Sequence, residues 1–470
     1  MATEAIEPLL HPTPEERAAR GKAAREACSR RRHANFEPTG RDPVSLLEAQ
    51  AATRIPELVP IRYGRMLVSP FAFHRGTSAV MAYDLAPLPR SGLDAQLCGD
   101  AHLGNFGGFG SAERDLVFDL NDFDETLPGP FEWDVKRLAA SIAIAGRTRM
   151  LGESACRTAV VAMVASYREA MRQFAQMGNL EVWYARVSVD GLVTRLSEER
   201  QEAEASSLAR AGEKARSRDH LKAFRKLTTT VDGQPRIRYD PPLVIPVGEL
   251  FGGTVARDEI ETLVRSILAG FRSTLQADRR ELLDSYEVVD VAHKVVGVSS
   301  VGTRCWIVLM IGRDTSDPLF VQVKEAQASV LEPYLGASGF ATHGQRVVSG
   351  QRLMQATGDL FLGWHRATEL DNTERDYFCR QLWDWKGSAN LDTLDAGTLG
   401  PYGRLCGWTL ARAHARSGDR IAIAEYLGKG DTFDEAIMTF ASVYADQNER
   451  DYSAFEQAAR NGRIEVVEGV

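Results

Sequence analysis

The densest group of chemically competent side chains lies in residues 98–125, here called the acidic loop. Asp100 and Asn105 stand five residues apart, and Asp119 and Asp122 follow Asn105 by 14 and 17 residues. Phosphoryl transfer needs such a set, because one carboxylate must orient or deprotonate the acceptor hydroxyl while amide and carboxylate oxygens hold Mg²⁺ against phosphates. Asp and Asn also cap helices and turns, which is the structural alternative. Two acidic clusters flanked by glycine and apolar residues favour the chemical interpretation.

A second set of candidates comes much later in the chain. Gly297 and Gly302 flank a turn, here called the glycine turn (residues 297–303), in which backbone amides could approach phosphates. Lys324 ends an alternating apolar strand 22 residues after Gly302. Glu325 and Glu332 are both candidates for a carboxylate that pairs with Lys324, and helical geometry after Glu325 favours Glu332.

Arg75 is a further candidate, in the run Arg75-Gly76-Thr77. Its planar guanidinium could bind a phosphate or the acidic loop, and Gly76 would allow close approach. An internal salt bridge is the structural alternative.

The elements that must position these residues divide the chain into four parts. We expect an Arg- and Ala-rich segment over residues 1–40, with a helix starting near Thr13. The acidic loop and a helical part occupy 41–284, a β-rich part that binds nucleotide occupies 285–390, and further helices fill 391–470. This is an α+β fold with a small antiparallel sheet and a larger, mainly helical part.

Apolar periodicity sets finer expectations within these parts. Residues 61–124 are expected to form short strands and functional loops, with Phe71-Ala72-Phe73 among the strands. Helix should begin after Pro130, and the proline-rich stretch 231–247 should form an ordered loop or hairpin. The helical pattern returns at 402–416 and 432–460.

Composition narrows the class of protein. The 470 residues include 56 Lys and Arg against 64 Asp and Glu, a net charge of −8, so nucleic-acid binding is not expected. No apolar run reaches the 18 or more residues that a membrane-spanning helix needs, and no secretory signal is visible, so we expect a cytoplasmic protein without membrane association. The six cysteines lack metal-ligand spacing and are expected to be buried thiols.

The acidic loop, with G-D-x-H-x-x-N followed by an apolar-D-F-D pattern, resembles the catalytic and metal loops of aminoglycoside phosphotransferases and choline kinases, a branch of the protein-kinase-like fold. The resemblance implies that Asp100 is the catalytic base and Asn105 a magnesium ligand. Asp122 best matches the second magnesium ligand, with Asp119 the competitor. Asp134 and Arg137 resemble the helix that braces the catalytic loop in those enzymes. Cys98 departs from the pattern, which usually has histidine there.

The order of the motifs differs from that of kinases, in which the glycine loop and the lysine come first. Here Asp100 precedes Gly297 by nearly 200 residues, which a circular permutation would explain. The run LARAHA at 410–415 resembles the large-lobe helix that normally precedes the catalytic loop. The resemblance therefore implies a two-lobed, circularly permuted kinase-like fold, with the motif order restored when the chain is followed from residue 286 to the end and then from its start.

The whole chain also resembles the bacterial family known as domain of unknown function 2252 (DUF2252). The resemblance covers roughly residues 40–460 and rests on the motifs FHRGT at 73–77, LCGDAHLGNFG at 97–107, FDLNDFDE at 118–125, QVKEA at 322–326 and ARAHA at 411–415. It implies no established substrate.

The leading hypothesis is a phosphotransferase that uses ATP and Mg²⁺ and acts on a hydroxyl or amine of a small molecule or a protein. Transfer of AMP in place of phosphate stays open, as do the acceptor and the oligomeric state. One alternative is a metallophosphoesterase, because Asp100 and His102 could form a metal-ligand pair. The other is a nucleotide-binding regulatory module without catalysis.

Overall fold

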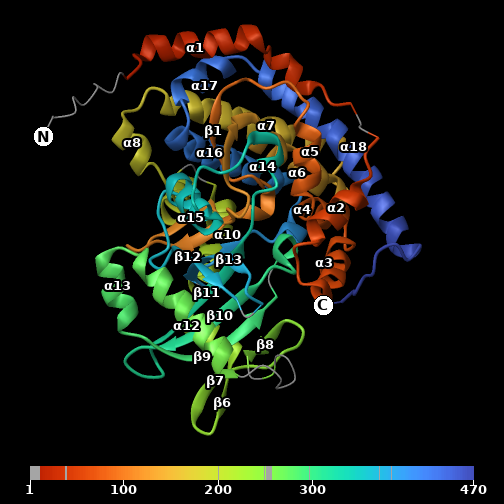
Figure 1. Cartoon of the computed structure of the whole chain (residues 1–470). Coiled ribbons are helices and arrows are strands. Elements are labelled where there is room, and N and C mark those ends of the chain that lie inside the picture. The colour runs from red at the N-terminus through yellow and green to blue at the C-terminus, as the bar shows by residue number, and fades with distance from the viewer. Residues whose placement is uncertain are drawn as a thin grey trace, which may run out of the picture.

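An antiparallel sheet and a set of long helices form the two main parts of the chain, and in Figure 1 the helices lie above the sheet. The computed structural model describes residues 11–37, 40–198, 201–247, 249, 257–295, 297–369, 371–382 and 384–469. Residues 1–10 of the expected N-terminal segment lie outside this range. The expected α+β class is confirmed.

The sheet has six strands, in the spatial order β12-β13-β11-β10-β9-β8. All neighbouring pairs are antiparallel. The strands are β8 (Val244–Pro246), β9 (Glu287–Lys294), β10 (Cys305–Ile311), β11 (Pro318–Ala326), β12 (Gly363–Thr368) and β13 (Glu374–Gln381). Five of them, β9 to β13, lie within residues 285–390, the part that the sequence predicted to be rich in strands.

Strand β11 is buried along its whole length because both of its faces are covered. Val321 and Val323 pack in one apolar cluster with residues of α12 (Arg257–Ser273). Side chains alternate along a strand, so Gln322 and Lys324 point to the opposite face. On that face Lys324 pairs with Asp124 of the acidic loop. The alternation of β11 therefore decides which way Lys324 faces.

The helical part is built around α6 (Phe131–Thr148), which is buried over nearly its whole length. It begins directly after Pro130, as the sequence predicted. The long helices around it are α7 (Glu153–Phe174), α16 (Ala396–Ser417) and α18 (Thr432–Arg460). Two shorter helices lie outside these, α17 (Arg420–Leu427) and α1 (Pro14–Ala27). The capping box of Thr13 and Glu16 confirms the expected start of α1.

The segment before the acidic loop is helical, which corrects the strand predicted at Phe71-Ala72-Phe73. Its helices are α2 (Pro43–Ala51), α3 (Val59–Met66), α4 (Pro70–Arg75) and α5 (Ser78–Leu85). Ser69 caps α4 by accepting a hydrogen bond from the Ala72 N–H, and Pro70 occupies the first helical position. These two residues form a helix start, and it overrides the strand-like apolar run.

Smaller elements complete the fold. The acidic loop contains a hairpin of β2 (Phe106–Gly110) and β3 (Leu116–Leu120) within a four-stranded sheet of order β14-β2-β3-β5. The expected hairpin in 231–247 is present in part, as β6 paired with β7. The remaining elements are β1 (Asp94–Leu97), β4 (Leu127–Pro130), β5 (Val187–Ser188), β6 (Thr228–Val231), β7 (Gln234–Ile237), β14 (Gly387–Ser388), α8 (Asn179–Tyr184), α9 (Val189–Glu198), α10 (Glu202–Arg216), α11 (His220–Leu227), α13 (Ala277–Asp284), α14 (Glu332–Leu335) and α15 (His343–Met354).

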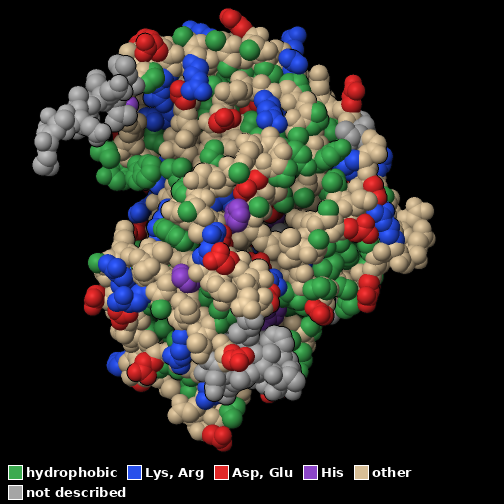
Figure 2. Space-filling view, viewed as in Figure 1, with side chains coloured by type: hydrophobic (Ala, Val, Ile, Leu, Met, Phe, Trp, Pro, Cys, Tyr) green, Lys and Arg blue, Asp and Glu red, His purple; other side chains and the backbone are tan. Residues whose placement is uncertain are grey.

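The surface carries both signs of charge. On the face shown in Figure 2, Lys and Arg side chains alternate with Asp and Glu side chains, as expected from the nearly balanced composition. Within the described ranges, no helix is long and apolar enough to cross a membrane.

The contact between α16 and α7 offers a test of packing. A Cβ at Gly407 of α16 would lie 2.3 Å from the carbonyl oxygen of Met163 in α7. Because the obstacle is backbone, we expect Gly407→Ala to lower the free energy of unfolding by about 1–3 kcal/mol. Denaturation by urea measures this.

The matched control is Gly397→Ala in the same helix. Gly397 is exposed, and a Cβ there would be 3.4 Å from Asp395 Oδ1, an ordinary contact. Since alanine has the higher helix propensity, this variant should be neutral or more stable by up to about 1 kcal/mol. Equal stability of the two variants would contradict the close contact at Gly407.

Candidate active site

The turn that carries Asp100 is held by a carboxylate of α6. Asp134 accepts hydrogen bonds from the backbone N–H groups of Cys98 (2.8 Å) and Gly99 (3.1 Å). Gly99 has φ +83°, and a Cβ there would lie 2.3 Å from the Glu125 carbonyl oxygen. Only glycine fits this position, because the backbone is left-handed and another part of the acidic loop approaches it closely.

His414 of α16 supports Asp134 from the other side. Its ring nitrogens lie 3.4 Å from Asp134 Oδ2 and 2.9 Å from the hydroxyl of Tyr167. The bracing role predicted for Asp134 is therefore present in the structure.

Asp100 is buried and its carboxylate is fixed by Arg137. The Arg137 Nε lies 2.9 Å from Asp100 Oδ1, and the amide nitrogen of Asn105 donates to the Asp100 carbonyl oxygen over 2.7 Å. Burial raises the pKa of Asp100 to about 6; the positive charge of Arg137 opposes this effect and the negative charge of Asp122 adds to it. Asp100 can therefore change protonation state near neutral pH, as a general base must.

His102 has a supporting position in the acidic loop. Its Nδ1 accepts a hydrogen bond from the Gly104 N–H (3.1 Å), and its Nε2 lies 3.7 Å from Asp100 Oδ2. Burial lowers the pKa of His102 well below its ordinary value, and the charges of Arg75 and Arg137 act in the same direction. His102 is therefore neutral and stabilises the turn.

Lys324 of β11 reaches the end of the acidic loop. Its ammonium group forms an ion pair with Asp124 Oδ2, and the Lys324 side chain is only 3% exposed. Although burial opposes it, the charges of Asp124 and Asp122 raise the pKa of Lys324. Asp122, two residues earlier, is also surrounded by cations: burial would raise its pKa, but Lys324, Arg380 and Lys386 together lower it. Asp122 is thus held in its charged form.

The glycine turn lies against the same carboxylate. Ser300 Oγ donates to Asp124 Oδ2 over 3.3 Å. Gly302 has φ +91°, and its carbonyl oxygen accepts a hydrogen bond from the Ile55 N–H (2.8 Å). Gly297 is exposed at the other end of the turn. Asp124 therefore contacts both Ser300 of the glycine turn and Lys324 of β11, which follow it in the sequence by 176 and 200 residues.

The partner of Lys324 differs from both predicted residues. Glu332 accepts a hydrogen bond from the Ser329 N–H (3.1 Å) and lies 3.8 Å from Arg346 Nε. Glu325 pairs with Arg304 at 3.4 Å, because adjacent residues of a strand face opposite ways. Asp124 takes the place predicted for Glu332. Its position in the run Asp122-Phe123-Asp124 was the only signal of it in the sequence.

Asp119 is engaged elsewhere, so we do not assign it to a metal. It forms a buried ion pair with Arg412 of α16, and its Oδ2 accepts a hydrogen bond from the Ala356 N–H (2.9 Å). Asp119 is one of the inward residues of β3, whereas Asp122 follows the end of the strand and lines a cavity. Of the two competitors, Asp122 is the one that faces the site.

Arg75 ends α4 beside the acidic loop. Burial lowers the pKa of Arg75, while the negative charges of Asp100, Asp122 and Asp392 act in the opposite direction. Its Nε is buried without a hydrogen-bond partner. Within the part of the chain that the structure describes, Arg75 has no ion pair within 4 Å, so its guanidinium could interact with a bound anion.

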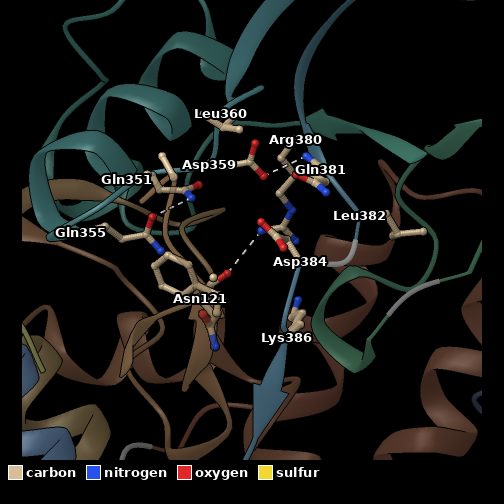
Figure 3. Close-up of a pocket in the computed structure, with 14 residues that line it drawn as sticks. Asn121, Gln351, Gln355, Asp359, Leu360, Arg380, Gln381, Leu382, Asp384 and Lys386 are labelled. Carbon is tan, nitrogen blue, oxygen red and sulfur yellow. Dashed lines mark hydrogen bonds between the residues drawn. The ribbon is translucent and has the colours of Figure 1, made fainter. Parts of the chain in front are cut away.

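Two cavities flank the residues 121 and 122. The smaller one, here called the acidic cavity, is lined by Gln50, Arg62, Gly76, Ser78, Asp100, Asp122, Asp124 and Glu125. The larger one, here called the hairpin cavity, has an empty volume of about 610 Å³ and lies between β2, the end of α15 and the segment that follows β13 (Figure 3). Arg380 and Lys386 project into it in Figure 3. Sequence reasoning missed both cations, because no motif surrounds them.

The side-chain oxygens at this site suit a metal ion that phosphates also bind better than a metal ion that the protein alone binds. Among the described residues, no three His, Cys, Asp or Glu side chains converge on a metal position. Mg²⁺ is commonly bound by one or two carboxylates together with substrate phosphates. Asp122 and the amide of Asn105 could supply that share, and the buried Oδ1 of Asp124 has no hydrogen-bond partner.

Most of the helices and strands described above lie in the region that matches a known protein family. The model of a family described as "Uncharacterized protein conserved in bacteria (DUF2252)" matches residues 54–458. The chain belongs to the DUF2252 family. No curated protein and no solved structure is significantly similar to it. The DUF2252 match includes the acidic loop, Lys324 and α16, and leaves α1 outside.

The environment of Glu125 predicts how stability changes with pH. Burial raises the pKa of Glu125 from its ordinary value of 4.5 to about 7, so the folded protein favours the neutral form. The stability that the neutral carboxyl group gives the folded protein is fully present below about pH 4.5, and it is lost as the pH rises through about 7. Between about pH 5 and pH 8, the free energy of unfolding should therefore fall by about 1–3 kcal/mol more in the wild type than in Glu125→Gln.

Urea denaturation at each pH measures this difference. The control is Glu113→Gln, because Glu113 is exposed at the tip of the β2–β3 hairpin. It should keep the pH dependence of the wild type. If the free energy of unfolding changes by the same amount over this pH range in the wild type and in Glu125→Gln, then Glu125 is charged in the folded protein.

Proposed function

We propose that this protein is a phosphotransferase that uses ATP and Mg²⁺. The observation that carries the proposal is the convergence of Asp100, Asp122 and Asp124 on one cavity, where Lys324 from a distant segment of the chain pairs with Asp124. A catalytic base, a metal ligand and a phosphate-binding lysine are the parts that phosphoryl transfer requires.

The arrangement suggests where a nucleotide binds. The hairpin cavity opens beside Asn121 and is lined by Arg380 and Lys386, so we assign the base and sugar to it. The phosphates then extend past Asp122 toward Lys324 and the glycine turn. Asn105 and Asp122 would hold Mg²⁺, which neutralises charge that develops on the phosphoryl oxygens.

Asp100 would act on the acceptor. Its carboxylate takes the proton from the acceptor hydroxyl or amine, the freed oxygen or nitrogen bonds to the terminal phosphorus, and the bond to the ADP oxygen breaks. Arg137 keeps the carboxylate oriented through the whole step. Lys324 exchanges Asp124 for phosphate oxygens when the nucleotide binds.

We also propose that the fold is a permuted relative of the kinase-like fold. Five strands, β9 to β13, with α14 and α15 between β11 and β12, would form the small lobe, and the helices around α6 the large lobe. The bracing of the Asp100 turn by Asp134 and His414 supports this proposal.

Magnesium-dependent nucleotide binding tests the site directly. A ligand that binds only the folded state raises its melting temperature. ATP should raise the melting temperature of the wild type by several degrees when Mg²⁺ is present, and by less without it. Lys324→Ala and Asp122→Ala should lose this magnesium-dependent shift.

Glu332→Gln is the control, because Glu332 is charged but contacts Arg346 instead of Lys324. It should keep the shift of the wild type. Full shifts in Lys324→Ala and Asp122→Ala would contradict the assignment. A response to Mn²⁺ or Zn²⁺ alone that depends on Asp100 and His102 would favour a metallophosphoesterase.

The role of Asp100 predicts a loss of rate without a loss of binding. Asp100→Asn keeps the shape of the side chain but removes the base, so ADP release should fall at least about 100-fold while nucleotide affinity stays within a few-fold. ADP release can be followed with water as acceptor or in an acceptor screen. In the wild type the rate should also fall as the pH drops below about 6, because Asp100 becomes protonated there.

Full activity in Asp100→Asn would exclude this residue as the base. ATP binding without any consumption by the wild type, over a broad acceptor screen, would favour a regulatory nucleotide-binding module. Release of pyrophosphate in place of ADP would show transfer of AMP.

A further inference from the structure

Arg62 of α3 is a buried cation that lines the acidic cavity. Its side chain is 0% exposed. One guanidinium nitrogen, Nη2, donates to Gln50 Oε1 and to the Gly76 carbonyl oxygen, each over 2.8 Å. The other two nitrogens, Nε and Nη1, are buried without a hydrogen-bond partner. Within the described ranges, no carboxylate lies within 4 Å of Arg62.

This arrangement is costly unless the cavity receives an anion. A buried charge without a partner costs several kcal/mol, and each unmade hydrogen bond of a buried donor adds to that cost. Arginine side chains in this protein are otherwise commonly paired when buried, as Arg137 and Arg412 are. The unpaired nitrogens of Arg62 are therefore positioned for an acceptor that the protein itself does not provide.

The first turn of α5 borders the same cavity. The helix begins at Ser78, which lines the cavity, and Thr77 is its N-cap residue. Thr77 does not cap the helix, because its hydroxyl donates backwards to the His74 carbonyl oxygen (2.9 Å). The first N–H groups of α5 thus lack a capping side chain, and the positive end of the helix dipole favours an anion there.

We propose that Arg62 and the first turn of α5 form a phosphate-binding subsite of the acidic cavity, beside Asp100. A phosphate group suits the subsite because a guanidinium can donate to two of its oxygens while helix amides donate to a third. As a part of the reaction, the subsite rests on the proposed function. The phosphate belongs either to the end of the nucleotide or to the acceptor molecule, and the experiment separates the two.

Inorganic phosphate is the first probe. At constant ionic strength, phosphate should raise the melting temperature of the wild type by a few degrees. Arg62→Met keeps the apolar stem and loses the guanidinium, so most of this shift should disappear. The control is Arg420→Met on α17, where Arg420 is 9% exposed and donates to the Phe174 and Met177 carbonyl oxygens away from both cavities. It should respond to phosphate as the wild type does.

ATP and ADP, each with Mg²⁺, identify the source of the phosphate. If Arg62→Met loses the extra stabilisation that ATP gives over ADP, the subsite holds the terminal phosphate of the nucleotide. If it keeps that difference and loses only the response to inorganic phosphate, the subsite holds a phosphate of the acceptor. If no nucleotide binds but phosphate still depends on Arg62, the subsite stands and the proposed function fails.

The proposal is overturned if phosphate does not stabilise the wild type, or if it stabilises Arg62→Met equally. Should Arg62→Met fail to fold, crystals of the wild type soaked in selenate decide the question. Anomalous density within hydrogen-bond distance of the Arg62 guanidinium would support the subsite. Its absence there would refute it.

Discussion

The ion pair between the buried Lys324 and the partly exposed Asp124 is the interaction on which the site depends. It joins the middle of the sheet to the end of the acidic loop, and both groups are far apart in the sequence. Removing Asp124 would leave the buried charge of Lys324 without its partner, so the pair fixes how the two parts face each other. Because desolvating these charges costs free energy, stability alone does not explain why the protein has this ion pair. In the proposed function the lysine is held ready for a phosphate.

A second constraint comes from α6, which supplies both Asp134 and Arg137. Asp134 binds the backbone of the Asp100 turn and Arg137 binds the Asp100 carboxylate, three residues later on the same buried helix. Because α6 is enclosed by other helices, it cannot shift without disturbing the core. The Asp100 turn is therefore held by a buried helix of the helical part, and the sheet contributes Lys324 from the other side.

The charges around this site are unevenly paired. Asp100, Asp122 and Asp124 share the acidic cavity with Glu125, while Lys324, Arg380 and Lys386 surround Asp122, and Arg62 and Arg75 keep buried nitrogens without partners. A protein that only needed to fold would pair or remove such groups. Carboxylates beside unsatisfied cations suit a ligand that carries phosphates together with a divalent cation. This charge pattern links the proposed phosphotransferase to the proposed phosphate subsite.

Much of this protein could be predicted from the sequence, because local patterns determine local structure. The helix after Pro130 and the strand that carries Lys324 follow from periodicity, and the closeness of Asp100 and Asp122 follows from their spacing in one loop. The tertiary structure alone decided which charges meet. Lys324 pairs with Asp124 and not with Glu332, and Asp119 pairs with Arg412 and so does not face the site. Arg62 lines the acidic cavity although it lies on a helix that carries no motif. A sequence pattern records neighbours along the chain, whereas pairing of charges depends on distance and burial after folding.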